Sequence, residues 1–178
     1  MTEPALPKFL IETNQTFIEA VAASGDTTEA SSGSPVTKPT SPLETTKAFV
    51  EATTSGDVEN MAALMTDDFT WCMLPATLGF PVKNKQEYLL HSAELRRIFA
   101  WLKVNVNNPL DVVQAGDTVV LHVIGEGALA NGTPYSDEYI IISRCEGGRV
   151  CSIKEFMDSE KIRSVLQAGD GVGAELAT

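Results

Sequence analysis

The fold is decided between Asp117 and Asp158, where the sequence reads DTVVLHVIGEGALANGTPYSDEYIIISRCEGGRVCSIKEFMD. Three strand-like runs lie in this stretch, at Asp117–Ala128, Tyr135–Cys145 and Arg149–Asp158. They are joined by Asn-Gly-Thr-Pro at 131–134 and Glu-Gly-Gly at 146–148, and Gly, Asn and Pro supply the backbone angles that reverse a chain between strands. The stretch therefore predicts an antiparallel meander whose last strand ends on an acid.

The composition of the chain limits its partners. Its net charge of −11 over 178 residues argues against nucleic acid and anionic membranes, which both need clustered Lys and Arg. The three Cys lack metal-ligand spacing and there are only two His, so we predict no metal site. No apolar run approaches the roughly 20 residues of a membrane span, and the first residues lack the basic segment of a secretion signal. We therefore expect a cytoplasmic protein with reduced thiols.

The chain divides into four parts. Residues 1–23 form an extension whose ragged apolar spacing over Pro7–Ala23 predicts a short amphipathic helix. Ser24–Pro42 predicts a disordered linker, because 14 of its 19 residues are Ser, Thr, Pro or Gly. The domain is expected at 43–168, and the Gly-containing tail at 169–178 is expected to fray.

The domain should combine helices with one sheet. Asp57 and Asn84 are of the residue types that cap helix N-termini. Helices are predicted at Leu43–Thr54, from Asp57 through Met65, at Lys85–Leu102 and at Ser159–Gln167, with an early strand at Phe69–Leu74. Because helices and hairpins are segregated along the chain, the fold class is α+β.

Several stretches within Leu43–Gln167 resemble the SnoaL-like family of the nuclear transport factor 2-like superfamily, which includes polyketide cyclases and small isomerases of secondary metabolism. The stretches are Ala48–Ala52, Ser55–Asp57, Leu64–Phe69, Leu74–Pro81 and Val150–Asp158. The variant Leu-Pro-Ala-Thr-Leu-Gly at 74–79 is most similar to fungal members. The resemblance is specific for the fold but not for the reaction, because the superfamily also holds non-catalytic adaptors.

This resemblance implies a cone-shaped, curved antiparallel sheet wrapped around three N-terminal helices, with a short C-terminal helix and one deep, mostly apolar pocket. Catalytic members of the family commonly use a carboxylate near the end of the last strand as general base. In this sequence Asp158 matches that position best, and Glu155 is the alternative.

Asp158 has two compatible interpretations. Strand alternation places it on one face with Lys154 and Phe156, opposite Glu155 and Met157. Apolar surroundings would raise the pKa of its carboxyl and suit it to base catalysis. Alternatively, Asp158 caps the helix that follows.

Two histidines are further catalytic candidates. His122 lies in the middle of an apolar strand, on the same face as Glu126, and either serves a pocket as proton shuttle or donor, or is a satisfied core or dimer-face residue. His91 lies one turn after Glu87 on the long helix, and is either an acid-oriented pocket imidazole or half of an exposed helix pair.

Six residues are predicted to bind substrate, with ordinary core packing as the alternative for the aromatic ones. They are Trp71, Met73, Tyr88, Glu126, Tyr139 and Phe156.

Two functions follow as hypotheses. Phosphate-binding loops, Cys-x-x-Cys pairs and serine-nucleophile elbows are absent from the sequence, so we predict no cofactor. The first hypothesis is a cofactor-independent cyclase, isomerase or dehydratase acting on a small hydrophobic carbonyl compound of polyketide or meroterpenoid type. The second is a non-catalytic dimeric module that binds a ligand or a protein. Apolar runs on both sheet faces, at 119–124 and 140–142, predict a homodimer through the sheet.

Overall fold

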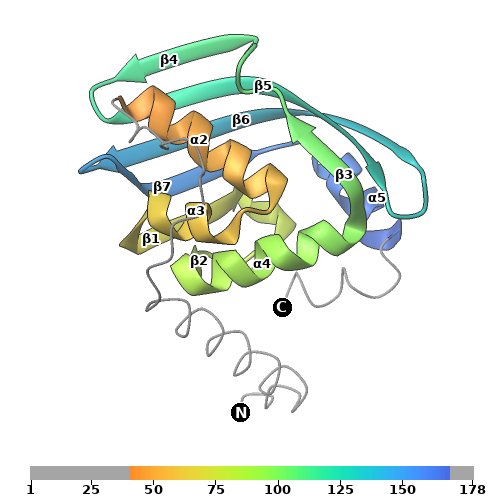
Figure 1. Ribbon diagram of the computed structural model, residues 1–178. Coiled ribbons are helices and arrows are strands. Elements are labelled where there is room, and N and C mark those ends of the chain that lie inside the picture. Colours follow the sequence, from red (N-terminus) through yellow and green to blue (C-terminus); the bar gives the residue numbers. More distant parts are fainter. Residues whose placement is uncertain (1–40, 169–178) are drawn as a thin grey trace, which may run out of the picture. The chain divides into compact units, whose positions relative to one another are not determined.

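The structure, a computed structural model, describes residues 41–168, in which several helices pack against one face of a curved sheet (Figure 1). The predicted extension at 1–23, the predicted linker up to residue 40 and the tail at 169–178 lie outside the described residues. Ser41 and Pro42, which were assigned to the linker, instead begin the first described helix. The Ser41 hydroxyl accepts a hydrogen bond from the Glu44 amide at 3.2 Å, and Pro42 occupies the first turn.

The helices begin and end where the sequence provides caps. Helix α2 (Pro42–Ser55) is followed by Gly56, which caps its C-terminus with a φ of 74° that favours glycine. Helix α3 (Val58–Leu64) is capped by Asp57, as predicted. Helix α4 (Lys85–Ile98) starts with a capping box between Asn84 and Glu87. A short 3-10 turn covers Ala76–Leu78, and α5 (Ser159–Ala168) follows the last strand. Within residues 41–168, no helix has the length and apolar character needed to cross a membrane.

The sheet has seven strands, in the order β2-β1-β7-β6-β5-β3, with β4 also paired to β5. The predicted meander is confirmed, and its strands pair antiparallel. The pair β1–β7 is parallel, because the helices and strands between them carry the chain back to the same end of the sheet. The strands are β1 (Met65–Leu74), β2 (Lys83–Asn84), β3 (Phe99–Val104), β4 (Asp111–Ala115), β5 (Thr118–Leu129), β6 (Pro134–Glu146) and β7 (Arg149–Phe156).

The predicted extent of the long helix is wrong at its C-terminal end. Helix α4 stops at Ile98, and the next residues form β3, in which Leu102 pairs with Gly127 of β5. Phe, Trp and Val favour strands, and pairing with β5 satisfies backbone groups that a longer helix would have satisfied internally. The apolar spacing at 98–102 fits both structures, so the spacing alone does not decide between them.

The two faces of the sheet differ in what covers them. Along β6, the inward side chains alternate with outward ones, and Tyr135, Asp137 and Tyr139 are buried. Helices α2, α3 and α4 lie on this inner face (Figure 1). Gly125 of β5 is also inward, and a Cβ there would lie 2.5 Å from the ring of Tyr139. Glycine at 125 therefore leaves room for Tyr139 to lie across the sheet.

Candidate active site

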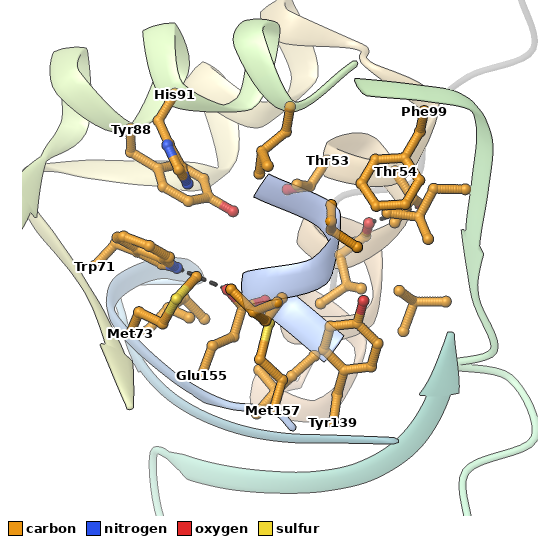
Figure 2. Close-up of a pocket in the computed structure, with 18 of the residues that line it drawn as sticks. Thr53, Thr54, Trp71, Met73, Tyr88, His91, Phe99, Tyr139, Glu155 and Met157 are labelled. Carbon is orange, nitrogen blue, oxygen red and sulfur yellow. Dashed lines mark hydrogen bonds between the residues drawn. The ribbon is translucent and has the colours of Figure 1, made fainter. Parts of the chain in front are cut away.

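A cavity of about 90 Å³ lies between the inner face of the sheet and helices α2, α4 and α5. Its volume is several times the roughly 10–15 Å³ that one water molecule needs. Most of its lining is apolar, from residues such as Phe49, Met73 and Ile141. Figure 2 shows side chains from both the helices and the strands pointing into this space, with Glu155 below and His91 above. The cavity is therefore large enough for a small ligand rather than filled by side chains.

A second hollow of about 280 Å³ adjoins the cavity and shares part of its wall, including Thr53, Leu95 and Phe99. The second hollow is bordered by Arg96 and by Trp101, whose side chain is 54% exposed. A ligand that reaches the cavity from this side would pass between α2 and α4.

Glu155 is the carboxylate of this cavity. It lies on β7 beside Met73 of the parallel neighbour β1, and both side chains line the cavity. Its Oε2 accepts a hydrogen bond from Trp71 Nε1 at 2.8 Å (Figure 2). Burial raises the pKa of the Glu155 carboxyl, and the Trp71 hydrogen bond offsets only part of this effect. A carboxyl with a raised pKa can accept a proton from a substrate and return it near neutral pH.

His91 is the second functional group that the structure places in the cavity. Its side chain is 2% exposed and its ring lies 4.9 Å from that of Trp71. Burial, and to a smaller extent the charge of Lys83, lower the pKa of His91 to about 3. Within the part of the chain that the structure describes, neither ring nitrogen has a hydrogen-bond partner. The imidazole is therefore neutral, with one N–H donor and one acceptor free for a ligand.

The predicted pairing of His91 with Glu87 is not formed. The Glu87 carboxylate instead accepts a hydrogen bond from the backbone N–H of Asn84 at 2.8 Å, at the start of α4. Because buried polar groups are almost always hydrogen-bonded, a histidine that lines a cavity with both nitrogens free indicates a place for a ligand.

Four of the six predicted substrate-binding residues line the cavity, namely Trp71, Met73, Tyr88 and Tyr139. Burial raises the pKa of the Tyr88 and Tyr139 hydroxyls, so both stay protonated at neutral pH. Figure 2 shows these two hydroxyls directed into the cavity from opposite sides, Tyr88 from α4 and Tyr139 from β6.

Asp158, the predicted base, lies outside the cavity. Its Oδ1 accepts hydrogen bonds from the backbone N–H groups of Glu160 at 2.9 Å and Lys161 at 3.5 Å, and its side chain is exposed. It is therefore the N-cap of α5, which was the alternative interpretation. The prediction of strand alternation was right, but the pocket lies on the face of Glu155 and Met157 rather than on the face of Asp158.

This placement predicts the behaviour of two Asp158 variants. Asp158→Asn should leave the thermal unfolding midpoint unchanged, because Asn caps as well as Asp. Asp158→Ala should lose about 0.5–2 kcal/mol of unfolding free energy, since α5 loses its cap. Both variants should keep full turnover. Thermal denaturation and an activity assay on the same preparations check this, and a loss of turnover in Asp158→Asn would contradict the placement.

Three more predicted site residues lie on the outer face of the sheet. His122 Nε2 contacts Glu138 Oε1 on the neighbouring strand, away from the cavity. Glu126 is exposed, and Phe156 is 48% exposed. The structure therefore does not bring His122, His91 and Asp158 together, and the predicted catalytic trio is wrong as a constellation.

Metal binding has no obvious place in residues 41–168, where no three His, Cys, Asp or Glu side chains gather as ligands. Cys145 is buried, and burial raises the pKa of its thiol, while its sulfur contacts Thr46 and Ser143 in the core. Cys145 therefore serves packing rather than chemistry.

The raised pKa of Glu155 has a consequence for stability. The folded-state pKa of this carboxyl lies above its ordinary value of 4.5. The protonated carboxyl therefore contributes its full stabilisation of the fold below pH 4.5, and this contribution is lost as the pH rises through the folded-state pKa. Glu155→Gln removes the titration and keeps an acceptor for Trp71. The unfolding midpoint of this variant should match that of the wild type near pH 4 and exceed it near pH 7.

Differential scanning calorimetry at several pH values measures this difference. A variant that is equally destabilised at every pH would show that the Glu155 carboxyl carries no desolvation penalty. Asp158→Asn is the control, because it makes the same carboxylate-to-amide change at an exposed position outside the cavity.

Comparisons with known proteins agree with this architecture. The SnoaL-like domain pattern matches residues 46–153. Monooxygenase ptaG from Pestalotiopsis fici is 24% identical over 127 residues, which cover 70% of this chain and 88% of that protein. The structure of AusH from Aspergillus nidulans superposes with a TM-score of 0.60 at 28% identity, over 66% of this chain and 84% of AusH. IdmH from Streptomyces antibioticus, a candidate polyketide cyclase, superposes with a TM-score of 0.59 at 21% identity, over 71% of this chain and 98% of IdmH.

Proposed function

Because this chain belongs to the SnoaL-like family and has the nuclear transport factor 2-like fold, we propose that it is a cofactor-independent acid–base enzyme acting on a small hydrophobic carbonyl compound. The observation that carries the proposal is Glu155, a half-buried carboxylate that lines an apolar cavity and accepts a hydrogen bond from Trp71. An acid in this position is costly for folding, and catalysis is a reason to keep it.

The reaction begins with proton abstraction next to a carbonyl group. Glu155 takes the proton from the carbon, and the electron pair moves onto the carbonyl oxygen as an enolate. The N–H of neutral His91 donates a hydrogen bond to that oxygen and stabilises its developing charge. In isomerisation the protonated Glu155 returns the proton to a different carbon, and in dehydration it gives the proton to a hydroxyl group that leaves as water. In cyclisation the enolate carbon attacks a second carbonyl group of the same substrate, and Glu155 gives the proton to the alkoxide that forms.

The apolar wall supports this chemistry. Water is largely excluded from a cavity lined by residues such as Phe49, Leu95 and Ile153, and electrostatic interactions inside are strengthened accordingly. The apolar lining of the cavity supports a hydrophobic substrate, and the adjoining hollow of about 280 Å³ adds room for one of polyketide or meroterpenoid type. An open cavity disfavours a module that uses only its sheet face to bind a protein, and a carboxylate in that cavity favours an enzyme over a module that only binds a ligand.

The name of the relative from Pestalotiopsis fici supports a second candidate, monooxygenation. Its first step is the same, because an enolate formed by Glu155 can react with dioxygen to give a hydroperoxide on that carbon. Loss of water from the hydroperoxide leaves a new carbonyl group, so the substrate itself supplies the electrons. Oxygen consumption during turnover distinguishes the two candidates, since isomerisation, cyclisation and dehydration consume none.

The experiment that tests the proposal starts from ligands. A panel of hydrophobic ketones is screened for a rise in the unfolding midpoint of the full chain, since a ligand that binds only the folded state stabilises it. The compounds that bind are then assayed for conversion by the wild type and by Glu155→Gln.

The predicted homodimer stays a prediction, and the outer sheet face is where it would form. Phe156 and Val113 are 48% and 55% exposed on the strands β7 and β4. Phe156→Glu should convert a dimer into a monomer in sedimentation velocity at micromolar concentration, because it places a charge in the apolar contact. A wild type that sediments as a monomer at that concentration would contradict the prediction.

A further inference from the structure

A buried acid outside the proposed reaction, Asp137, begins a chain of hydrogen bonds that ends in the cavity. Its side chain lies on the inner face of β6 and is fully enclosed. Its Oδ1 accepts a hydrogen bond from the backbone N–H of Glu138 at 2.7 Å and lies 3.7 Å from the Lys161 ammonium of α5. The amide N–H and the nearby ammonium, which itself donates to the Ser136 carbonyl at 2.7 Å, favour Asp137 as a hydrogen-bond acceptor.

The two tyrosines that precede and follow Asp137 on the same face continue the chain. The Tyr135 hydroxyl donates to Asp137 Oδ2 at 3.3 Å. The Tyr135 and Tyr139 hydroxyl oxygens lie 2.7 Å apart, so one of them donates to the other.

The direction of the second hydrogen bond follows from the first. A hydroxyl has a single proton, and that of Tyr135 is directed to Asp137. If Tyr135 donated to Tyr139 instead, its oxygen lone pairs would face the carboxylate oxygen with no proton between them. Tyr139 therefore donates to Tyr135, and only lone pairs of the Tyr139 oxygen remain for another partner.

Those lone pairs are available to a ligand. Tyr139 lines the cavity, and Figure 2 shows its hydroxyl directed into it. Burial raises the pKa of both tyrosine hydroxyls, so each keeps its proton and the direction of the chain is preserved at neutral pH.

We infer that the Asp137–Tyr135–Tyr139 chain fixes the Tyr139 oxygen as a hydrogen-bond acceptor in the cavity, so that the substrate carries a hydroxyl group at this end in addition to its carbonyl group. The inference that the substrate has a hydroxyl group rests on the hydrogen-bond chain alone. The inference that it has a carbonyl group rests on the proposed function. The substrate class is then a hydroxylated hydrophobic ketone, such as a phenolic or enolic one.

A matched pair of probes tests the inference by binding alone. 4′-Hydroxyacetophenone offers a hydroxyl donor, and 4′-methoxyacetophenone has an ether in its place. Isothermal titration calorimetry on the full chain gives the ratio of their dissociation constants. The wild type should bind the hydroxylated probe more tightly, and Tyr139→Phe should reduce that preference about three- to tenfold, as expected for one lost hydrogen bond.

Tyr135→Phe separates the chain from Tyr139 itself. Without its acceptor, the Tyr139 proton turns into the cavity, where it can donate to the ether oxygen, so the preference should fall at least as far as in Tyr139→Phe. A structural role for Tyr135 alone would weaken the binding of both probes equally. An unchanged preference in Tyr135→Phe would overturn the role of the chain.

In an alternative explanation, the Glu155 carboxylate rather than Tyr139 accepts the hydrogen bond from the hydroxyl group of the probe. Glu155→Gln is the matched control for this alternative. The inference expects the preference to persist in this variant. It is overturned if the preference disappears in Glu155→Gln but survives in Tyr139→Phe, or if the wild type has no preference or does not bind the hydroxylated probe. Turnover measurements bear only on the proposed function, whereas the ratio of the two dissociation constants bears only on the inference. A failure of the inference and a failure of the proposed function are therefore distinguishable.

Discussion

Glu155→Gln should lower turnover by a factor on the order of 10²–10⁴, the usual effect of losing a general base. Gln has nearly the same shape and can still accept the hydrogen bond that Trp71 donates to Glu155 at 2.8 Å. The variant should therefore fold, and it should bind a ketone ligand about as tightly as the wild type. The effect should fall on kcat, because the interaction that is lost belongs to the transition state.

The matched control for this prediction is Asp158→Asn, which makes the same chemical change three residues further along the chain. Asp158 is exposed and caps α5, so its amide variant should keep full turnover. If Asp158→Asn were inactive and Glu155→Gln active, the base would lie outside the cavity, contrary to the geometry.

His91→Phe should lower turnover by about 10²–10³-fold, the range for removing one donor to a developing oxyanion. Its effect on stability should have the opposite sign. His91 is buried, neither of its nitrogens has a hydrogen-bond partner among residues 41–168, and such groups cost about 1–3 kcal/mol each when desolvated. Phe keeps the aromatic packing against Trp71 without this cost, so the unfolding midpoint should be unchanged or higher.

Two further variants sharpen the His91 prediction. His91→Gln retains an N–H donor and should recover part of the activity that His91→Phe loses. His122→Phe should be fully active, because His122 lies on the outer face beside Glu138. A destabilised His91→Phe with normal turnover would identify His91 as a packing residue.

Much of the fold could be predicted from the sequence because local signals agreed with one another. The turns at 131–134 and 146–148 set the hairpins of the meander, and Asp57 and Asn84 mark the helix starts that the structure contains. The strand β3 was missed, because its pairing with β5 joins segments distant in the sequence and leaves no signal within Phe99–Val104 itself.

The site was predictable in part. Strand alternation correctly placed Glu155 and Asp158 on opposite faces of the last strand, but it does not show which face of β7 packs against the helices. The neighbouring strand β1 contained information about which face of β7 lines the pocket. Trp71 and Met73 were predicted to line the pocket, and Met73 pairs in parallel register with Glu155. Residues paired in register share a face, but a sequence alone does not give the register.

Asp137 was missed for a related reason, and Tyr135 was recognised only as a core or pocket-lining residue. Their alternation with Tyr139 on β6 places the three side chains on one face, a pattern that is visible in the sequence. What makes them a functional chain is their burial and the Lys161 ammonium, and α5 brings that group from 24 residues away in the sequence. Such long-range contacts are outside the reach of local patterns.

The most direct test of Glu155 as the base is the exchange of carbon-bound protons. Ketones that stabilise the full chain are incubated with it in D₂O, and NMR follows the loss of the signals next to the carbonyl group. The wild type should accelerate this exchange for at least one of them, and Glu155→Gln should slow the accelerated rate about 10²-fold or more. Undiminished exchange in Glu155→Gln would contradict the assignment of Glu155 as the base.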